Sequence, residues 1–103
     1  MTFIRTGFRE PFDFESITVS GTVVTLTSSK LSPSGVAPPV SALLSLETAA
    51  IRYRLDGVDP TTSEGHVLAV SDVLLLESIT ALRQFKAIKD TGDGATLKVS
   101  YFR

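Results

Sequence analysis

A strict alternation of apolar and polar side chains marks two segments of this chain and restricts both of them to β-strands. Residues 95 to 103, ATLKVSYFR, alternate along most of their length, and residues 51 to 55, IRYRL, do the same. Successive side chains of a strand point to opposite faces, so each segment is predicted to bury one face and expose the other. The side chains predicted to be buried are Ile51, Tyr53, Leu55, Ala95, Leu97, Val99 and Tyr101.

Three other segments carry strand signals of different kinds. Residues 17 to 27, ITVSGTVVTLT, change phase at Gly21, which predicts two short strands or one strand with a bulge. Residues 40 to 50, VSALLSLETAA, favour a strand, although a short helix would also suit them. Residues 72 to 78, DVLLLES, are apolar on both faces, which predicts a central strand covered on each side.

The connections between these segments have their own signatures. Residues 28 to 39 hold three prolines and four serines without a period, which predicts a surface loop. Residues 78 to 84, SITALRQ, predict a single helical turn that Ser78 caps. Residues 90 to 94, DTGDG, predict a hairpin turn.

Together these segments predict an all-β fold. About six to eight short strands recur at intervals of roughly 8–12 residues, and no long helical pattern interrupts them. We expect one antiparallel β-sandwich, jelly-roll or immunoglobulin-like, over residues 16 to 103, with an N-terminal arm at residues 1 to 15. A chain of 103 residues has room for one modest core.

Composition narrows the classes of partner. The 10 Lys and Arg residues face 11 Asp and Glu residues, whereas nucleic-acid-binding proteins usually carry a basic excess. The absence of cysteine excludes disulfides and thiolate metal sites. Apolar runs stay far below the roughly 20 residues of a membrane-spanning helix, and the start lacks a signal-peptide pattern. We therefore expect no nucleic-acid or membrane partner and synthesis in a cytoplasm.

The acidic stretch after residue 55 invites a comparison with metal sites. Asp56, Asp59 and Glu64 could offer oxygen ligands to calcium, but their spacing does not fit an EF-hand loop. Asp56 and Gly57 directly after a strand are a turn signal, because aspartate accepts from backbone N–H groups two residues on and glycine takes left-handed geometry. Pro60 sets a second bend. We interpret Asp56, Gly57, Asp59 and Pro60 as a structural turn, with a bound cation as the alternative.

Catalytic and cofactor motifs do not emerge from the pattern. His66 is the single histidine, and a triad or zinc site would need partners that the chain does not place at recognisable spacing. The glycines of DTGDGATLK run into a strand, whereas those of a phosphate-binding P-loop precede a helix. We predict no enzymatic activity, no metal and no cofactor.

Aromatic residues gather at the N-terminus. Four of the six phenylalanines precede the first strand predicted with a clear pattern, and an aliphatic residue lies among them. Buried aromatic rings dominate the energetics of cores and interfaces. The rings either complete the domain's own core or anchor an arm on a partner, and we predict partner binding by Phe3, Ile4, Phe8, Phe12 and Phe14.

Two resemblances extend this interpretation. The run YRLDGVDPT, residues 53 to 61, resembles a strand-and-turn of immunoglobulin-like accessory domains in chitobiase-type glycoside hydrolases. Residues 51 to 103 resemble small virion structural proteins of tailed bacteriophages. There, segments of the forms I-R-Y-x-x-D-G-x-x-P-T, G-H-x-L, L-R-x-F-x-A-I and A-T-L-x-V-x-Y-x-R follow one another in the same order as here.

The phage resemblance implies a non-enzymatic structural protein of the virion, most simply a capsid decoration or cement protein. It implies homo-oligomerisation, the major capsid protein or other virion proteins as partners, and assembly in the host cytoplasm. Neck, tail or fibre positions are alternatives within the same class. A glycan-binding accessory module is the alternative from another class, and it would need solvent-facing aromatic rings on a rigid face.

Overall fold

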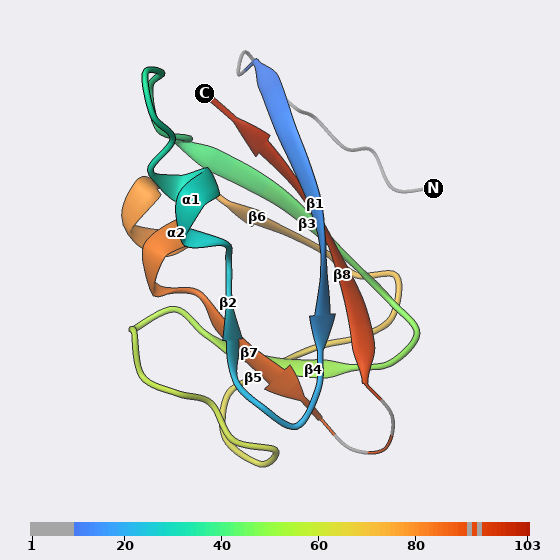
Figure 1. Cartoon of the computed structure of the whole chain (residues 1–103). Helices are drawn as coiled ribbons and strands as arrows, with labels where there is room; N and C mark the ends of the chain where they lie inside the picture. Colours follow the sequence, from blue (N-terminus) through green and yellow to red (C-terminus); the bar gives the residue numbers. More distant parts are fainter. Residues whose placement is uncertain (1–9, 91, 93) are drawn as a thin grey trace.

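A computed structural model describes residues 10 to 90, 92 and 94 to 103 of the chain. Across these residues, eight strands form two antiparallel sheets that face each other, and two short helices complete the fold (Figure 1). The predicted all-β sandwich is therefore confirmed. The strands are β1 (Pro11–Val19), β2 (Val24–Thr25), β3 (Ser41–Glu47), β4 (Ile51–Arg54), β5 (His66–Leu68), β6 (Val73–Leu76), β7 (Lys86–Lys89) and β8 (Ala95–Phe102), and the helices are α1 (Ser28–Leu31) and α2 (Ile79–Gln84).

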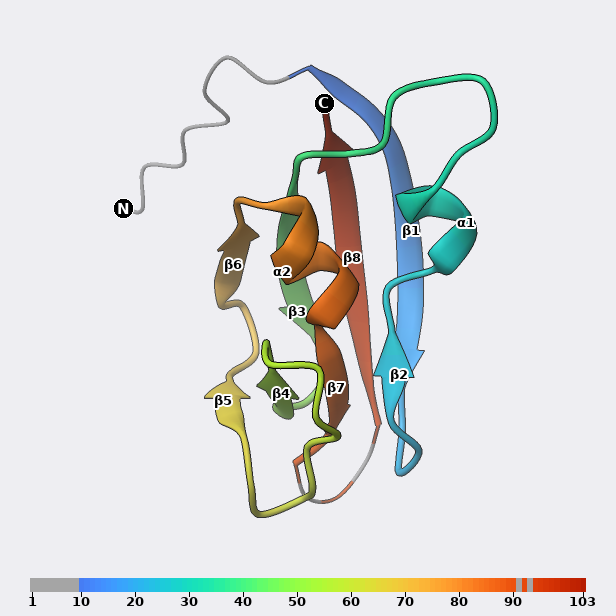
Figure 2. The ribbon, with the colours of Figure 1, turned by 90° about the vertical axis from the view of Figure 1, so that its left-hand side faces the viewer.

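The two sheets differ in length. Sheet A has the strand order β1-β8-β3-β6, and sheet B has the order β2-β7-β4-β5. The strands of sheet B are two to four residues long, so this sheet covers one part of the inner face of sheet A. Figures 1 and 2 show α1 and α2 side by side over the other part of that face. Neither helix has the length and apolar character needed to cross a bilayer.

The core lies between these layers and follows the predicted alternation of β8. Leu97, Val99 and Tyr101 are fully buried, while the residues between them are partly exposed. Leu31 of α1 and Leu82 of α2 are buried as well, and they close the end of the core that sheet B does not reach. Burial of apolar area at roughly 25 cal/mol per Å² is the main force that holds the two layers together.

The helical turn after residue 78 is confirmed. Ser78 is the N-cap of α2, and its hydroxyl accepts a hydrogen bond from the backbone N–H of Ala81 at 3.1 Å. Such a cap satisfies one of the backbone donors that the first turn of a helix leaves unpaired. Residues 40 to 50 contain β3, so the strand was the right alternative there.

The loop predicted for residues 28 to 39 was partly wrong, because α1 begins it. Leu31 in α1 is buried, so tertiary packing orders a turn that has no sequence period of its own. The phase change at Gly21 separates β1 from β2, so two strands were the right alternative there.

The hairpin predicted at residues 90 to 94 was wrong. The connection leaves β7 in sheet B and enters β8 in sheet A, and these two strands do not pair. A Cβ at Gly94 would lie 2.8 Å from the carbonyl oxygen of Val19, so glycine at this position allows a close approach of two backbones. The turn residues mark the change of direction without specifying the pairing of the strands beside it.

The central strand predicted at residues 72 to 78 was also wrong, because β6 is an edge strand of sheet A. Its inward residues Leu74 and Leu76 pack on the core. Its outward residues are exposed, Val73 to 40% and Leu75 to 47%. An apolar residue on the second face of a strand therefore does not indicate burial here, and this face needs another explanation.

Candidate interaction surface

The outer face of sheet A carries a row of side chains with one residue from each strand. Phe14 of β1 lies opposite Ser100 of β8. Ser100 also lies opposite Leu43 of β3, and Leu43 lies opposite Leu75 of β6. We call Phe14, Ser100, Leu43 and Leu75 the outer row. Phe14 is 55% exposed, and Leu43 is partly exposed.

A second row runs beside the outer row and is mostly small and polar. Ser16, Lys98, Ser45 and Val73 occupy it in the order β1-β8-β3-β6. The Lys98 ammonium donates a hydrogen bond to the Ser16 hydroxyl at 2.9 Å and makes no ion pair among the described residues. Glu47, two residues beyond Ser45 on β3, is exposed and also makes no ion pair in the described part of the chain.

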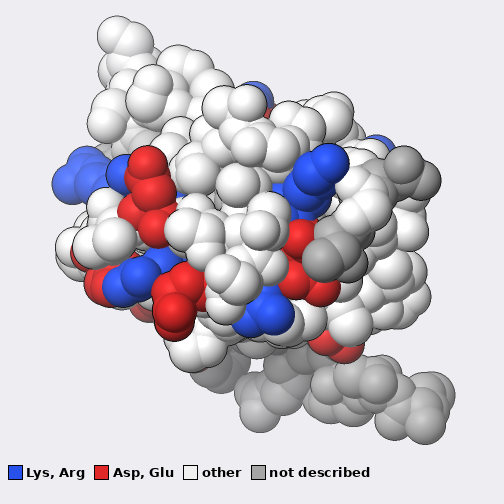
Figure 3. Space-filling view, turned by 90° about the horizontal axis from the view of Figure 1, so that it is seen from below, with Lys and Arg blue, Asp and Glu red and all other residues white. Residues whose placement is uncertain are grey.

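Charges distinguish the outside of sheet B from this face. Arg52 and Arg54 of β4 pair with Asp90 and Asp56 at 2.9 and 2.5 Å. Lys86 of β7 pairs with Asp59 at 2.9 Å. Figure 3, a view from below, shows acidic and basic side chains interleaved at that end of the molecule. The arginines of β4 and Lys86 of β7 on the outside of sheet B are thus paired with carboxylates of the same chain, whereas the outer row exposes apolar area next to Lys98 and Glu47, which make no ion pair among the described residues.

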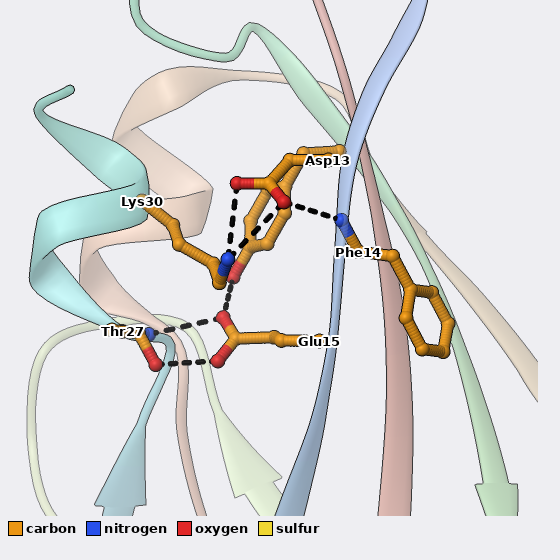
Figure 4. A network of polar contacts seen from close by, with 6 residues as sticks. Asp13, Phe14, Glu15, Thr27 and Lys30 are labelled. Atoms are coloured by element: carbon orange, nitrogen blue, oxygen red, sulfur yellow. Dashed lines mark hydrogen bonds and ion pairs between the residues drawn. The ribbon is translucent and has the colours of Figure 1, made fainter.

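On the inner side of β1, a polar network holds this edge strand in place (Figure 4). The Glu15 carboxylate accepts hydrogen bonds from the Tyr101 hydroxyl of β8 and from the backbone N–H and hydroxyl of Thr27. The Asp13 carboxylate accepts from the Lys30 ammonium of α1 at 3.0 and 3.1 Å. Figure 4 shows Phe14 pointing away from the side on which Asp13 and Glu15 meet these partners. The network therefore fixes the alternation that presents Phe14 on the outer face.

Hydrogen bonds lower the pKa values of two aspartates, Asp13 and Asp56. The hydrogen bonds from Lys30 and from the backbone N–H of Phe14 lower the pKa of Asp13. The hydrogen bonds from Arg54 and the backbone N–H of Val58 lower the pKa of Asp56 to about 2. Both carboxylates favour the folded state in their charged form.

An acid titration of stability follows from these two shifts. Unfolded aspartate has a pKa of about 3.9, so both contributions are complete above that value and are lost as the pH falls towards 2. We expect the melting temperature to fall between pH 4 and pH 2, and we expect Asp13→Asn to reduce this fall while costing about 0.2–1 kcal/mol at pH 7, the range for exposed ion pairs. Thermal melts followed by circular dichroism check this. An unchanged acid profile in Asp13→Asn would contradict the assignment.

The acidic stretch forms a turn whose carboxylates are used inside the chain. Gly57 has a φ of +79°, and the Asp56 carboxylate accepts a hydrogen bond from the backbone N–H of Val58 at 3.3 Å. Asp56 and Asp59 pair with Arg54 and Lys86 as described above, and Pro60 is buried. The described residues contain no group of three or more side chains placed to hold a metal ion.

A hollow of about 480 Å³ lies beside this turn. His66 lines it, and the His66 ring lies 5.4 Å from the Tyr53 ring in a tilted arrangement. The Arg54 guanidinium at the hollow is bound to Asp56. The other lining residues are Leu55, Glu64 and Gly65.

Of the residues predicted to bind a partner, Phe3, Ile4 and Phe8 lie outside the described residues. Phe12 and Phe14 belong to β1, so the predicted arm of residues 1 to 15 overlaps the sandwich by the first half of this strand. Pro11 opens β1, a position that tolerates the missing N–H. Phe12 packs against the core, and the Arg103 guanidinium lies 4.6 Å from its ring centroid. Phe14 alone of the two is exposed.

Leu43, Val73 and Leu75 belong to the exposed face, although sequence reasoning did not select them. For Val73 and Leu75 the signal is the apolar second face of residues 72 to 78, a pattern that predicts burial.

In comparisons with known proteins, no family model matches the chain, and no curated protein matches it.

Proposed function

We propose that this protein is a non-enzymatic structural component of a bacteriophage particle, a capsid decoration or cement protein that works as a homo-oligomer. The observation that carries the proposal is the outer face of sheet A, where Phe14, Leu75 and Val73 expose apolar area on a rigid four-stranded sheet. Exposed apolar area of this kind marks binding surfaces in soluble proteins. The resemblance of residues 51 to 103 to virion structural proteins supplies the biological setting.

The N-terminal segment supplies the contact with the shell in this proposal. Phe3, Ile4 and Phe8 precede β1, and such residues act as anchors when they enter a partner's apolar pockets. Many weak contacts at symmetric positions of a shell together make a stable layer. The partners are accordingly the major capsid protein or other virion proteins, with neck, tail or fibre positions as alternatives.

A glycan-binding module is the second candidate, and the exposed ring of Phe14 is the observation that favours it. Such a module would bind its ligand through solvent-facing aromatic rings on a rigid face. Tyr101, Phe85 and Phe102 are buried, and Tyr53 is half-buried between His66 and Phe85. Phe14 is the one exposed phenylalanine or tyrosine ring among the described residues, so this candidate has less support than assembly.

Co-sedimentation with empty heads of the phage that encodes the chain tests the proposal. We expect the full-length protein to bind the heads saturably and the variant Phe3→Ala/Phe8→Ala to bind at least 10-fold more weakly, since hot-spot aromatics each contribute about 2 kcal/mol or more. The control is Val67→Ala on β5, a 51% exposed residue outside both the N-terminal segment and the outer face of sheet A, and we expect it to bind as the wild type does. Absence of binding to heads, tails and fibres, together with retention on a polysaccharide column that Phe14→Ala abolishes, would instead establish the glycan module.

A further inference from the structure

We propose that the outer face of sheet A binds a second copy of this chain, in a face-to-face dimer whose two-fold axis runs parallel to the strands. The inference rests on the proposed function and deepens it, because it names the partner of the exposed face. A two-fold interface must be complementary to itself, so the test of the idea is whether the two rows match their own rotated copies.

The outer row matches its rotated copy in size. Rotation about an axis parallel to the strands keeps each residue at its height and reverses the strand order β1-β8-β3-β6. Phe14 of one copy then lies over Leu75 of the other, and Leu43 lies over Ser100. At the centre of the face the large side chain of Leu43 thus meets the small side chain of Ser100, and packed layers interdigitate in this way.

An axis perpendicular to the strands would give a poorer match. It would place Phe14, Leu43 and Leu75 each over the same residue of the other copy. At the centre of the face Leu43 would then lie over Leu43 and Ser100 over Ser100, so a wide pair would stand next to a narrow one, whereas the parallel axis gives two equal pairs of Leu43 and Ser100 there. Gaps and overpacking both lose packing energy, so the parallel axis is the arrangement that the rows favour.

The charges on the face match in the same arrangement. Because β8 lies over β3 of the other copy, Lys98 lies over Ser45, and Glu47 follows two residues further along that strand. The distance along a strand for two residues is about 7 Å, which a lysine side chain can span. Glu47 is also the diagonal neighbour of Lys98 within one copy, about 7–8 Å away across β3 and β8, yet the two make no ion pair among the described residues and Lys98 donates to Ser16 instead. The dimer adds the Glu47 of the other copy within reach of each Lys98, in two symmetric places.

The area of the face sets the expected strength. The four strands lie about 4.8 Å apart and rise about 3.3 Å per residue, so the outer face of sheet A measures about 450 Å². Two copies in contact over this face would together bury about 900 Å². Stable interfaces bury about 1,200–2,000 Å², and about 1,000 Å² is a working minimum. We therefore expect a dimer that forms at high micromolar concentration and is strengthened where a shell holds copies close together.

Thiol crosslinking tests the arrangement directly, because the chain has no cysteine of its own. Full-length Phe14→Cys and Leu75→Cys are prepared separately, mixed at about 200 μM, and treated with a bismaleimide whose reach matches the roughly 10 Å between packed sheets. We expect the mixture to give at least fivefold more crosslinked dimer than Phe14→Cys alone. In the proposed dimer two Phe14 positions are three strands apart sideways, about 14 Å, and out of reach.

If Phe14→Cys alone crosslinks as much as the mixture does, Phe14 lies against Phe14 of the other copy, and the proposed axis is wrong. No crosslinking in either sample would overturn the dimer. In that case head binding still separates the two claims: a protein that binds heads but does not crosslink keeps the structural function and loses the dimer, whereas a protein that crosslinks but binds no virion part keeps the dimer and loses the function.

Discussion

Replacing Phe85 with alanine is expected to lower the free energy of unfolding by about 3–5 kcal/mol. Phe85 is 0% exposed and ends α2, where its backbone N–H donates to the carbonyl of Ala81. Its ring stacks on the Tyr53 ring with centroids 5.9 Å apart. The substitution removes the ring and leaves a cavity between α2 and sheet B. Since domains of this size are stable by about 5–15 kcal/mol, the change should shift the urea midpoint strongly.

Phe14→Ala is the matched control for that experiment, because it makes the same chemical change at a residue that is 55% exposed. We expect it to change the free energy of unfolding by no more than about 0.5 kcal/mol at a concentration where the chain is monomeric. Equal losses in Phe85→Ala and Phe14→Ala, measured by urea unfolding, would mean that Phe14 is part of the core and that the outer face is not an exposed surface.

Tyr101→Phe is expected to cost about 1.5–3 kcal/mol, the usual value of a hydrogen bond to a charged group. The Tyr101 hydroxyl donates to Glu15, and burial together with this hydrogen bond raises the pKa of Tyr101, so the hydroxyl remains a donor at ordinary pH. Phenylalanine keeps the ring in the core but leaves the Glu15 oxygen without its donor from β8. The remaining donors to Glu15 come from Thr27.

Tyr53→Phe is the control for this substitution. The Tyr53 hydroxyl makes no hydrogen bond within the described part of the chain, so its removal should cost less than about 0.5 kcal/mol. Urea unfolding of both variants at pH 7 provides the comparison. If Tyr101→Phe proves as stable as Tyr53→Phe, then Glu15 does not depend on Tyr101, and β1 is held by backbone pairing with β8 alone.

Local chemistry explains why some parts of the fold could be predicted from the sequence. The alternation of residues 95 to 101 and the cap at Ser78 depend on neighbours within a few residues, and both were found. The turn at Asp56 and Gly57 is local in the same sense, because an aspartate side chain and a positive φ make it. These features need no knowledge of the rest of the chain.

Pairing between distant segments could not be predicted in this way. Residues 90 to 94 have the composition of a hairpin turn, yet the strands on each side join different sheets. Residues 72 to 78 have the composition of a buried strand, yet β6 is an edge. A single sequence does not show which strands are neighbours, and the outer row exists only because β1, β8, β3 and β6 lie next to one another.

The candidate surface illustrates the same limit at the level of single residues. Phe14 was selected because aromatic residues cluster near the N-terminus, and the structure places it on the exposed face. Leu43 and Leu75 are 32 positions apart in sequence, and nothing local connects them. Their opposition across β3 and β6 is what brings apolar side chains together with Phe14 on one face.

Light scattering across a dilution series tests most directly the claim that the outer face of sheet A is where the protein associates. The comparison uses the wild type, Leu75→Asp on that face, which puts a carboxylate over Phe14 of the other copy, and Val67→Asp on β5 of sheet B, where the valine is 51% exposed. We predict that the wild type and Val67→Asp rise measurably above the 11.0 kDa chain mass near 200 μM and return to it on dilution, and that Leu75→Asp stays at 11.0 kDa throughout. A monomeric wild type, or equal behaviour of the two variants, would contradict this account.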